Sequence, residues 1–280
     1  MSESAETAPT TSTTDEFMET QEYRRFAEFC DACRRYRYIG LCYGAPGVGK
    51  TLSARHYTRW DLLGPALRTQ WWLEPSTLPS AVAACRTLLY TPTMTATPRR
   101  LADELSQLQY ALKIAVARAL QPDEDELVMN IPTLPERTEL LIVDEADRLK
   151  FPTLEQLRDE YDRRGFGLVL IGMPGLERRL ARYAQFYSRV GFVHQFRALS
   201  ADGLRLILVH KWEQLGLTLS PHDVTDAEAI GAILRITGGN FRLVHRLFSQ
   251  VERIMEINGL RTITPDVVDA ARQSLVIGTA

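Results

Sequence analysis

The chain has 280 residues, of which 45% are hydrophobic and 24% are charged, the balance of a globular protein with a sizeable core. These proportions exclude a wholly disordered chain, a collagen-like repeat and a disulfide scaffold. No apolar run reaches the roughly 18 residues that predict a membrane span. The net charge is −2, from 33 Lys and Arg against 35 Asp and Glu. A nucleic-acid partner would therefore require a local basic surface.

Residues 1–18 are rich in Ser, Thr and acids, and their low hydrophobicity predicts a flexible tail. This segment lacks the apolar stretch of a secretory signal, so we expect a cytoplasmic protein. From Thr20 to Tyr36 apolar residues recur at helical spacing. Cys30 and Cys33 fit that apolar stripe, and we interpret them as small core residues. Half a zinc site is the alternative, but a structural zinc needs four ligands and no second cysteine pair matches.

A short β-prone run from Tyr38 to Tyr43 leads into a sequence that matches the P-loop pattern, and a helix-compatible stretch follows to about Trp60. The glycines of such a loop let backbone N–H groups surround phosphates at a helix N-terminus. Lys50 would reach those phosphates, and the Thr51 hydroxyl would bind Mg²⁺. The pattern predicts ATP and Mg²⁺ as cofactors, with nucleotide contacts from Gly44, Ala45, Pro46, Gly47, Val48, Gly49, Lys50, Thr51, Leu52 and Asp144.

Strands alternate with helices along the next part of the chain, which predicts a parallel α/β sheet up to about residue 197. The segment 60–80 is expected to be irregular or to carry short elements of its own, and the acidic run 123–126 to be a solvated loop. Further strands are expected at 86–91, 140–143, 168–172 and 192–196, and helices at 98–119, 153–164 and 175–186. Beyond residue 200 only helical patterns follow, at 201–215, 226–236, 240–258 and after Pro265. We expect a tail (1–18), an α/β domain (19–197) and a helical domain (198–280).

The apolar run from Leu140 to Val143 ends in Asp144 and Glu145, as expected of a strand that is buried on both faces. Asp144 is suited to hold Mg²⁺ together with Thr51. Glu145 can polarise the water that attacks the γ-phosphate, although it could also be an N-cap for the next helix. The acidic pair favours hydrolysis over phosphoryl transfer to a small acceptor.

Several strings point to a family: the P-loop, Val143-Asp-Glu-Ala-Asp-Arg-Leu149, Gly172-Met-Pro-Gly-Leu-Glu-Arg-Arg-Leu180 and Gly238-Gly-Asn-Phe-Arg242. Over about residues 20–275 the chain resembles AAA+ ATPases, and among them the DNA-transposition regulators of the TnsC, TniB and phage Mu B group. The resemblance implies an α/β P-loop NTPase core with a parallel sheet, followed by a small α-helical lid domain.

The resemblance also implies roles for two arginines. Arg189 lies where AAA+ proteins place an arginine finger, which enters the site of a neighbouring subunit. Arg242 matches the sensor arginine that contacts the γ-phosphate from the lid of the same subunit. The alternatives are a surface arginine at 189 and a solvated helix-start arginine at 242. The chain departs from the family where Met173 replaces a polar sensor, because a thioether cannot orient water as Asn or Thr would. We therefore expect slow hydrolysis that depends on assembly.

The resemblance places duplex DNA near the end of the second strand and along the helix that follows. The expected DNA contacts are Thr95, Arg99, Arg100, Lys113 and Arg118. Contacts to phosphates would give sequence-tolerant and salt-sensitive binding. The alternative is a solvated helix face.

Together these features predict a Mg²⁺-dependent ATPase that oligomerises with ATP on double-stranded target DNA, as a helical filament or ring, and recruits or activates a transposase. Hydrolysis would drive disassembly, and a target-selection protein is a further expected partner; no membrane is involved. One alternative is a switch ATPase that acts on protein partners in secretion or signalling. Another is a replication-initiator-like ATPase, which would normally carry an added winged-helix domain, for which residues after 275 leave too little length.

Overall fold

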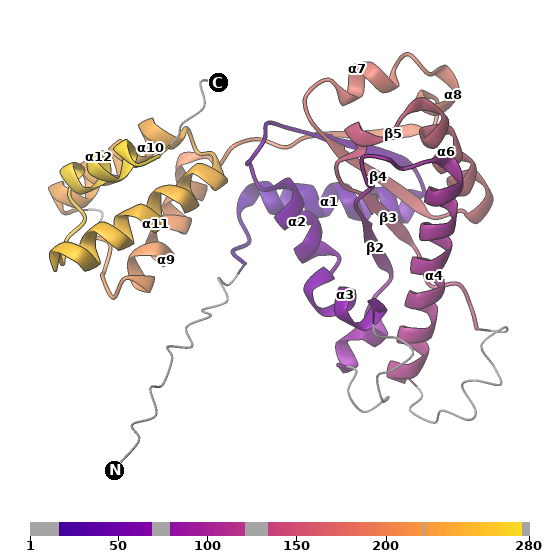
Figure 1. Ribbon diagram of the computed structural model, residues 1–280, viewed down its shortest axis with the longest axis horizontal. Coiled ribbons are helices and arrows are strands. Elements are labelled where there is room, and N and C mark those ends of the chain that lie inside the picture. Colours follow the sequence, from indigo (N-terminus) through magenta and orange to yellow (C-terminus); the bar gives the residue numbers. More distant parts are fainter. Residues whose placement is uncertain (1–16, 69–78, 121–133, 221, 276–280) are drawn as a thin grey trace, which may run out of the picture.

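The computed structural model describes residues 17–68, 79–120, 134–220 and 222–275, shown as coloured ribbon in Figure 1. Five parallel strands form one sheet in the order β2-β3-β4-β1-β5. The strands are β1 (Ile39–Tyr43), β2 (Thr87–Tyr90), β3 (Leu140–Val143), β4 (Gly167–Gly172) and β5 (Val190–Gln195). The α/β fold with a parallel sheet, predicted from the alternating pattern, is confirmed.

The helices fall into two groups along the chain. Those that accompany the sheet are α1 (Gln21–Tyr36), α2 (Lys50–Tyr57), α3 (Trp60–Arg68), α4 (Pro98–Leu120), α6 (Phe151–Arg164), α7 (Leu176–Leu180) and α8 (Ala184–Tyr187), with 3-10 turns η2 (Ser80–Ala84) and η4 (Ala146–Arg148). Those that follow it are α9 (Ala201–Gln214), α10 (Val224–Thr237), α11 (Phe241–Asn258) and α12 (Pro265–Gln273). None of the helices in the described residues is long and apolar enough to cross a membrane.

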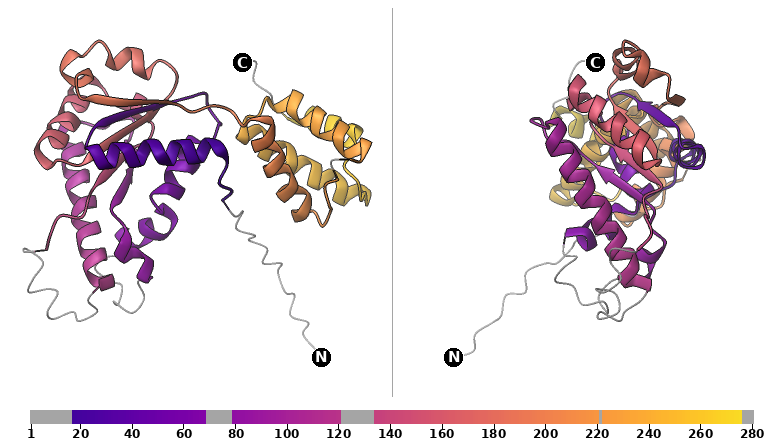
Figure 2. Two further views of the ribbon diagram at one scale, coloured as in Figure 1. Left: turned by 180° about the vertical axis from the view of Figure 1, so that it is seen from behind. Right: turned by 90° about the vertical axis from the view of Figure 1, so that its right-hand side faces the viewer.

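The sheet is buried on both faces, so its central strands are continuously apolar. Successive side chains alternate between two hydrophobic clusters. On β3, for example, Ile142 packs on the side of α1, whereas Leu141 packs with α4 and α6 on the other side. Figures 1 and 2 show α1 and α4 on opposite faces of the sheet. Cys30 and Cys33 are fully buried in the α1 cluster, in agreement with their interpretation as core residues.

Helices α9 to α12 have a hydrophobic core of their own, centred on the buried Trp212. The Trp212 indole donates a hydrogen bond of 3.3 Å to the buried Asp226 carboxylate. An extended segment after β5 connects this helical part to the sheet (Figures 1 and 2). Met18, at the end of the expected tail, packs against the helical core. The domain boundaries at residues 18 and 197 stay a prediction.

One helix differs from the sequence expectation, and one segment left open is now defined. The single helix expected over 175–186 is split into α7 and α8, because Leu180 and Phe186 are both buried in the core although their six-residue spacing would place them on different sides of one helix. The segment 60–80, for which an irregular chain and short elements are both expected, begins with α3, which buries Leu63 and Leu67. The acidic run 123–126, and residues 1–16 of the expected tail, lie outside the described residues.

Candidate nucleotide-binding site

The P-loop joins the end of β1 to the start of α2. Gly44 N–H donates to the carbonyl oxygen of Gly172 over 3.3 Å, so the loop begins beside the end of β4. Gly47 and Gly49 have φ values of 80° and 110°, a region in which only glycine avoids steric strain. These conformations turn the loop back so that α2 begins at Lys50, with its N-terminus facing the pocket. A helix N-terminus of this kind favours anions.

Lys50 extends across the P-loop. Its ammonium donates hydrogen bonds to the carbonyl oxygens of Gly44 (2.6 Å) and Ala45 (2.8 Å). Burial lowers the pKa of Lys50, and the nearby carboxylates of Asp144 and Asp147 oppose that lowering. An anion entering the pocket would compete for this ammonium with two neutral carbonyl groups. Because hydrogen bonds between opposite charges are stronger, the competition favours the anion.

Asp144 and Thr51 meet at the floor of the pocket. The Thr51 hydroxyl donates a hydrogen bond of 2.6 Å to Asp144 Oδ2, and the N–H of Glu145 donates one of 2.9 Å to Oδ1. Asp144 is buried, with 3% of its surface exposed. A hydroxyl and a carboxylate in contact supply the hard oxygen ligands that Mg²⁺ prefers. The two residues therefore fit the magnesium site expected from the sequence.

Glu145 begins the turn that follows β3. Its φ of 53° is left-handed, an uncommon conformation for a residue with a side chain, and such backbone strain clusters at functional sites. The Glu145 carboxylate forms an ion pair with Arg148. Arg148 also donates a hydrogen bond of 3.1 Å to the carbonyl oxygen of Pro92, just beyond β2. Glu145 is thus half-exposed at the pocket and held by a residue of its own turn.

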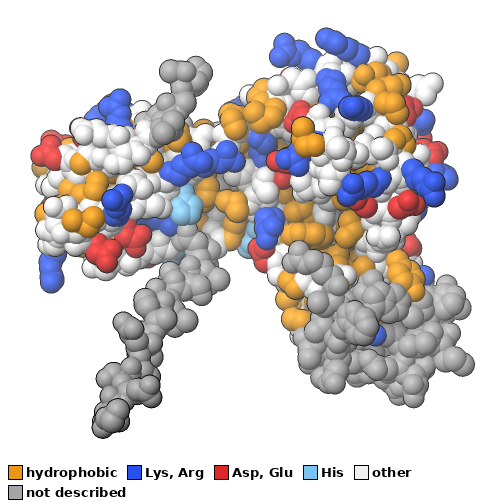
Figure 3. Space-filling view, in the orientation of Figure 1, with side chains coloured by type: hydrophobic (Ala, Val, Ile, Leu, Met, Phe, Trp, Pro, Cys, Tyr) orange, Lys and Arg blue, Asp and Glu red, His pale blue; other side chains and the backbone are white. Residues whose placement is uncertain are grey.

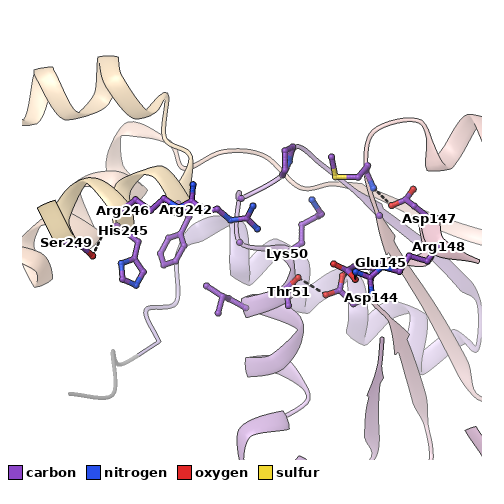
Figure 4. A pocket seen from close by; sticks show the side chains of 17 residues that line it. Lys50, Thr51, Asp144, Glu145, Asp147, Arg148, Arg242, His245, Arg246 and Ser249 are labelled. Carbon is purple, nitrogen blue, oxygen red and sulfur yellow. Dashed lines mark hydrogen bonds and ion pairs between the residues drawn. The ribbon is translucent and has the colours of Figure 1, made fainter. Parts of the chain in front are cut away.

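The helical part reaches the P-loop through the start of α11. Asn240 caps this helix through the N–H of Leu243, and its side-chain amide donates a hydrogen bond of 2.8 Å to the carbonyl oxygen of Pro46. The N–H of Arg242 donates one of 2.9 Å to the carbonyl oxygen of Gly47. Figure 4 shows the Arg242 side chain extending from α11 toward Lys50. The sheet and the helical part therefore share one site.

These residues surround a pocket of about 870 Å³, a size that accommodates a nucleotide. Asp147, Arg148, His245 and Arg246 also line it, and none of them was predicted from the sequence. Signals for them exist. Asp147 and Arg148 belong to the string that contains Asp144 and Glu145. His245 and Arg246 follow Arg242 by three and four residues, so they share its helix face.

A second cavity, of about 270 Å³, lies next to the first and shares Gly49, Leu52, Phe241 and His245 with it. Its lining surface is largely apolar and comes mainly from the segment before α1, the P-loop with α2, and the helical part, with Phe196 from the end of β5. Phe17 contributes to the lining, and its ring stacks on His56 with centroids 3.9 Å apart. A flat apolar group could fit between these elements.

Arg189 lies at the opposite edge of the sheet from the P-loop. Its carbonyl oxygen accepts a hydrogen bond from the N–H of Ile39, the first residue of β1, whereas the P-loop follows the last. Its guanidinium forms an ion pair of 2.7 Å with Asp162 on α6. The length of β1, about 16 Å, separates Arg189 from the pocket of its own subunit. Arg189 could therefore contact nucleotide only in the pocket of another subunit.

The five residues expected to bind DNA do not form one compact patch. Arg99 and Arg100 lie in the first turn of α4, close to Thr95, but Arg118 is about 28 Å farther along the helix. Arg100 is paired with Glu104 at 2.7 Å, and Arg99 lies 4.0 Å from Asp103. On the face of the molecule in Figure 3, basic side chains are interspersed with acidic ones. Local pairing therefore reduces the positive charge that the start of α4 offers.

The fold and the pocket define a P-loop ATPase of the AAA class. The family model for the AAA domain matches residues 33–180, and the chain belongs to this family. It is 46% identical over 252 residues to a potential ATP-binding protein of Staphylococcus aureus, covering 88% of this chain and 91% of the relative. It is 28% identical over 219 residues to the Mu-like prophage FluMu DNA transposition protein B of Haemophilus influenzae, covering 74% of this chain and 62% of that protein.

Solved structures share the fold. The RuvB Holliday junction branch migration motor of Thermotoga maritima superposes with a TM-score of 0.58 at 16% identity, covering 95% of this chain and 72% of RuvB. The ADP form of the ORC2 protein of Aeropyrum pernix gives 0.56 at 17% identity, covering 93% and 71%. The expected AAA+ fold and the resemblance to the transposition-regulator group are confirmed.

Proposed function

We propose that this protein is an ATP-dependent DNA-binding regulator of transposition. In this proposal it assembles on duplex DNA with ATP bound, recruits or activates a transposase, and leaves the DNA after hydrolysis. The observation that carries the ATPase part is the convergence of Lys50, the Thr51–Asp144 pair, Glu145 and Arg242 on one pocket. The transposition part is supported by the similarity to a DNA transposition protein B over 74% of the chain.

In the proposed reaction, a water oxygen attacks the γ-phosphorus and the bond to the β-phosphate oxygen breaks, releasing ADP and phosphate. Glu145 first separates from Arg148 and then accepts a proton from the attacking water. Lys50 and Arg242 would both bind the phosphates. Thr51 and Asp144 would hold Mg²⁺, which when bound neutralises charge on the phosphate oxygens. The adenine ring would enter the apolar second cavity beside Leu52 and Phe241.

The proposed assembly uses Arg189 as a residue of the neighbouring active site. Because Arg189 lies at the far edge of its own sheet, this role is open to it only between subunits. The Arg189–Asp162 ion pair would have to open when subunits join, and the lost pair would be replaced by contact with phosphate. Hydrolysis would then be slow in the monomer and faster in the oligomer.

For DNA, we propose contacts from Thr95, Arg99 and Arg100 of each subunit, with Lys113 and Arg118 in a separate part of the path along α4. Asp103 and Glu104 neutralise part of this charge, so each subunit alone would bind weakly. Repetition along an oligomer would multiply the contacts, since linked sites raise overall affinity far above that of one site. ATP-controlled oligomerisation would in this way control DNA binding.

The test is a filter-binding titration of a duplex with the protein in the presence of a non-hydrolysable ATP analogue, ADP or no nucleotide. The expected result is tight binding only with the analogue, of similar affinity for unrelated sequences. Lys50→Ala is the control that removes the phosphate contact and should bind DNA in none of these conditions. Nucleotide binding without any nucleotide-dependent DNA binding would contradict the proposal and favour a switch ATPase acting on protein partners.

A further inference from the structure

Asp147 lines the pocket next to the end of β4, although it belongs to the turn that follows β3. It is the second residue of η4, the turn after Glu145, and its Oδ2 accepts a hydrogen bond of 2.7 Å from the N–H of Met173. Figure 4 shows this bond on the side of the pocket opposite Arg242. The Asp147 carboxylate thus lies beside Met173, where the end of β4 has no polar side chain of its own.

Gly172 provides the space for this carboxylate. A Cβ added at Gly172 would lie 2.5 Å from Asp147 Oδ2 and 2.9 Å from Oδ1, closer than real Cβ contacts allow. The carbonyl oxygen of the same glycine binds the N–H of Gly44, the first residue of the P-loop. The carboxylate is therefore fitted against the backbone next to the phosphate-binding loop.

A water molecule that attacks a phosphorus atom has two hydrogens, and an acceptor for each of them fixes the orientation of the attacking oxygen. Glu145 can take one of them. The oxygens of Asp144 already accept hydrogen bonds from Thr51 and from the N–H of Glu145, and the Met173 thioether is a weak acceptor. Asp147 Oδ1 accepts no hydrogen bond from the described residues, so it remains available to a water.

We infer that Asp147 is a further residue of the hydrolytic site, whose carboxylate accepts the second hydrogen bond of the attacking water while Glu145 accepts the proton. This inference rests on the proposed ATPase function. The charge of Asp147 is tolerated beside phosphates because Lys50 lies near enough for the two to interact electrostatically. The carboxylate from the β3 turn thus compensates for the missing polar group on β4.

The decisive variant is Asp147→Asn. Its amide oxygen can still accept the Met173 N–H, so the contact between the turn and β4 is kept, but its NH₂ group would face the water as a donor. We expect kcat for ATP, measured with DNA present, to fall at least about tenfold, with KM and the affinity for an ATP analogue within about twofold. Gly172→Ala, which displaces the same carboxylate, should lower kcat similarly.

The matched control is Arg179→Ala. Arg179 braces the same turn by donating hydrogen bonds to the carbonyl oxygens of Asp147 and Leu149, without touching the carboxylate. It should lower thermal stability while keeping kcat within about threefold. Three results would overturn this inference but not the proposed function. They are a wild-type kcat in Asp147→Asn, an equal loss of kcat in Arg179→Ala, and a loss of analogue binding in Asp147→Asn. Absence of hydrolysis by the wild-type protein would overturn the proposed function as well.

Discussion

The N–H of Arg242 donates a hydrogen bond of 2.9 Å to the carbonyl oxygen of Gly47, which joins the helical part of the chain directly to the P-loop. A Cβ at Gly47 would lie 2.6 Å from Asn240 Oδ1 and 2.9 Å from Arg242 Cβ. Close approach and a positive φ therefore both require glycine at this position. Movement of the helical part would therefore displace the phosphate-binding loop, and movement of the loop would displace the helical part.

Gly47→Ala tests this contact. The added methyl group should push α11 away from the loop, so we expect ATP affinity to fall at least about tenfold, equivalent to about 1.4 kcal/mol. Gly165→Ala is the matched control, because Gly165 also has a positive φ (66°) but its Cβ would meet nothing within 4 Å. Both variants should lose stability from backbone strain, and only Gly47→Ala adds a clash with α11. Equal nucleotide affinity in the two variants would refute the role of the contact.

Glu145→Gln should separate nucleotide binding from hydrolysis. The amide cannot accept the proton of the attacking water, so kcat should fall by about 10²- to 10⁴-fold. The affinity for ATP should stay close to wild type, because Glu145 lies beside the pocket floor and makes none of the proposed phosphate contacts. Single-turnover hydrolysis and titration with a fluorescent ATP analogue measure the two quantities. Normal turnover would show that another group activates the water.

The role of Arg189 between subunits can be tested by mixing two inactive variants. Arg189→Ala should bind ATP but hydrolyse it poorly, whereas Lys50→Ala should not bind it. In a mixture, an intact pocket from the first variant can meet Arg189 of the second, so part of the ATPase activity should return. Co-assembly is checked by cross-linking. Co-assembled proteins without any recovery would count against a shared site.

DNA affinity should depend on the start of α4. Each phosphate contact adds about 0.9 to the slope of log affinity against log salt for duplex DNA. Replacing Arg99 and Arg100 by alanine should therefore weaken binding to every sequence alike and flatten this slope, while ATP binding persists. A second double variant, Lys113→Ala with Arg118→Ala, tests whether the part of α4 farther from its start contributes separately to DNA affinity. A double variant at 99 and 100 with wild-type affinity and slope would place the DNA surface elsewhere.

Stability should fall in acid through Glu22. Burial alone would raise its pKa, but His194, whose Nε2 lies 3.3 Å from Glu22 Oε1, and a hydrogen bond from the N–H of Arg197 outweigh burial and hold the pKa below the usual value. Because the pKa of Glu22 is lower in the folded than in the unfolded protein, its carboxylate stabilises the fold at pH values above the unfolded pKa, near 4.3. This stabilisation is lost as the pH falls through the folded pKa. Urea unfolding at pH 7 should show a cost of about 1–2 kcal/mol for Glu22→Gln, and a smaller one at pH 3.5. The exposed Glu28 on the same helix is the control, and an equal effect of Glu28→Gln would contradict this account.

Much of the fold could be predicted because its signals are local. The continuous apolar runs of β3 and β4 indicate strands buried on both faces, and the P-loop glycines specify a turn that other residues cannot adopt. The break between α7 and α8 could not be predicted in this way. It depends on Leu180 and Phe186 entering the same core, which is a property of the assembled sheet.

The candidate site shows the same division. Lys50, Thr51 and Asp144 could be identified because each has a fixed place in a motif, and the structure brings them together. Asp147 stands in the same string as Asp144, but its hydrogen bond with Met173, 26 residues away, depends on how β3 and β4 lie in the sheet. The pairing of Arg189 with Asp162, and of Arg100 with Glu104, likewise depends on side-chain positions that no spacing rule reports.

The central claim, that ATP controls assembly on DNA, is tested most directly by the lifetime of the DNA complex while ATP is consumed. Complexes of the wild-type protein and of Glu145→Gln would be formed on a fluorescent duplex with a limited amount of ATP, and their release followed by anisotropy. The account predicts that the wild-type complex dissociates as ATP is converted to ADP, whereas the Glu145→Gln complex persists. Equal lifetimes for the two proteins, or complexes that form equally well with ADP, would contradict it.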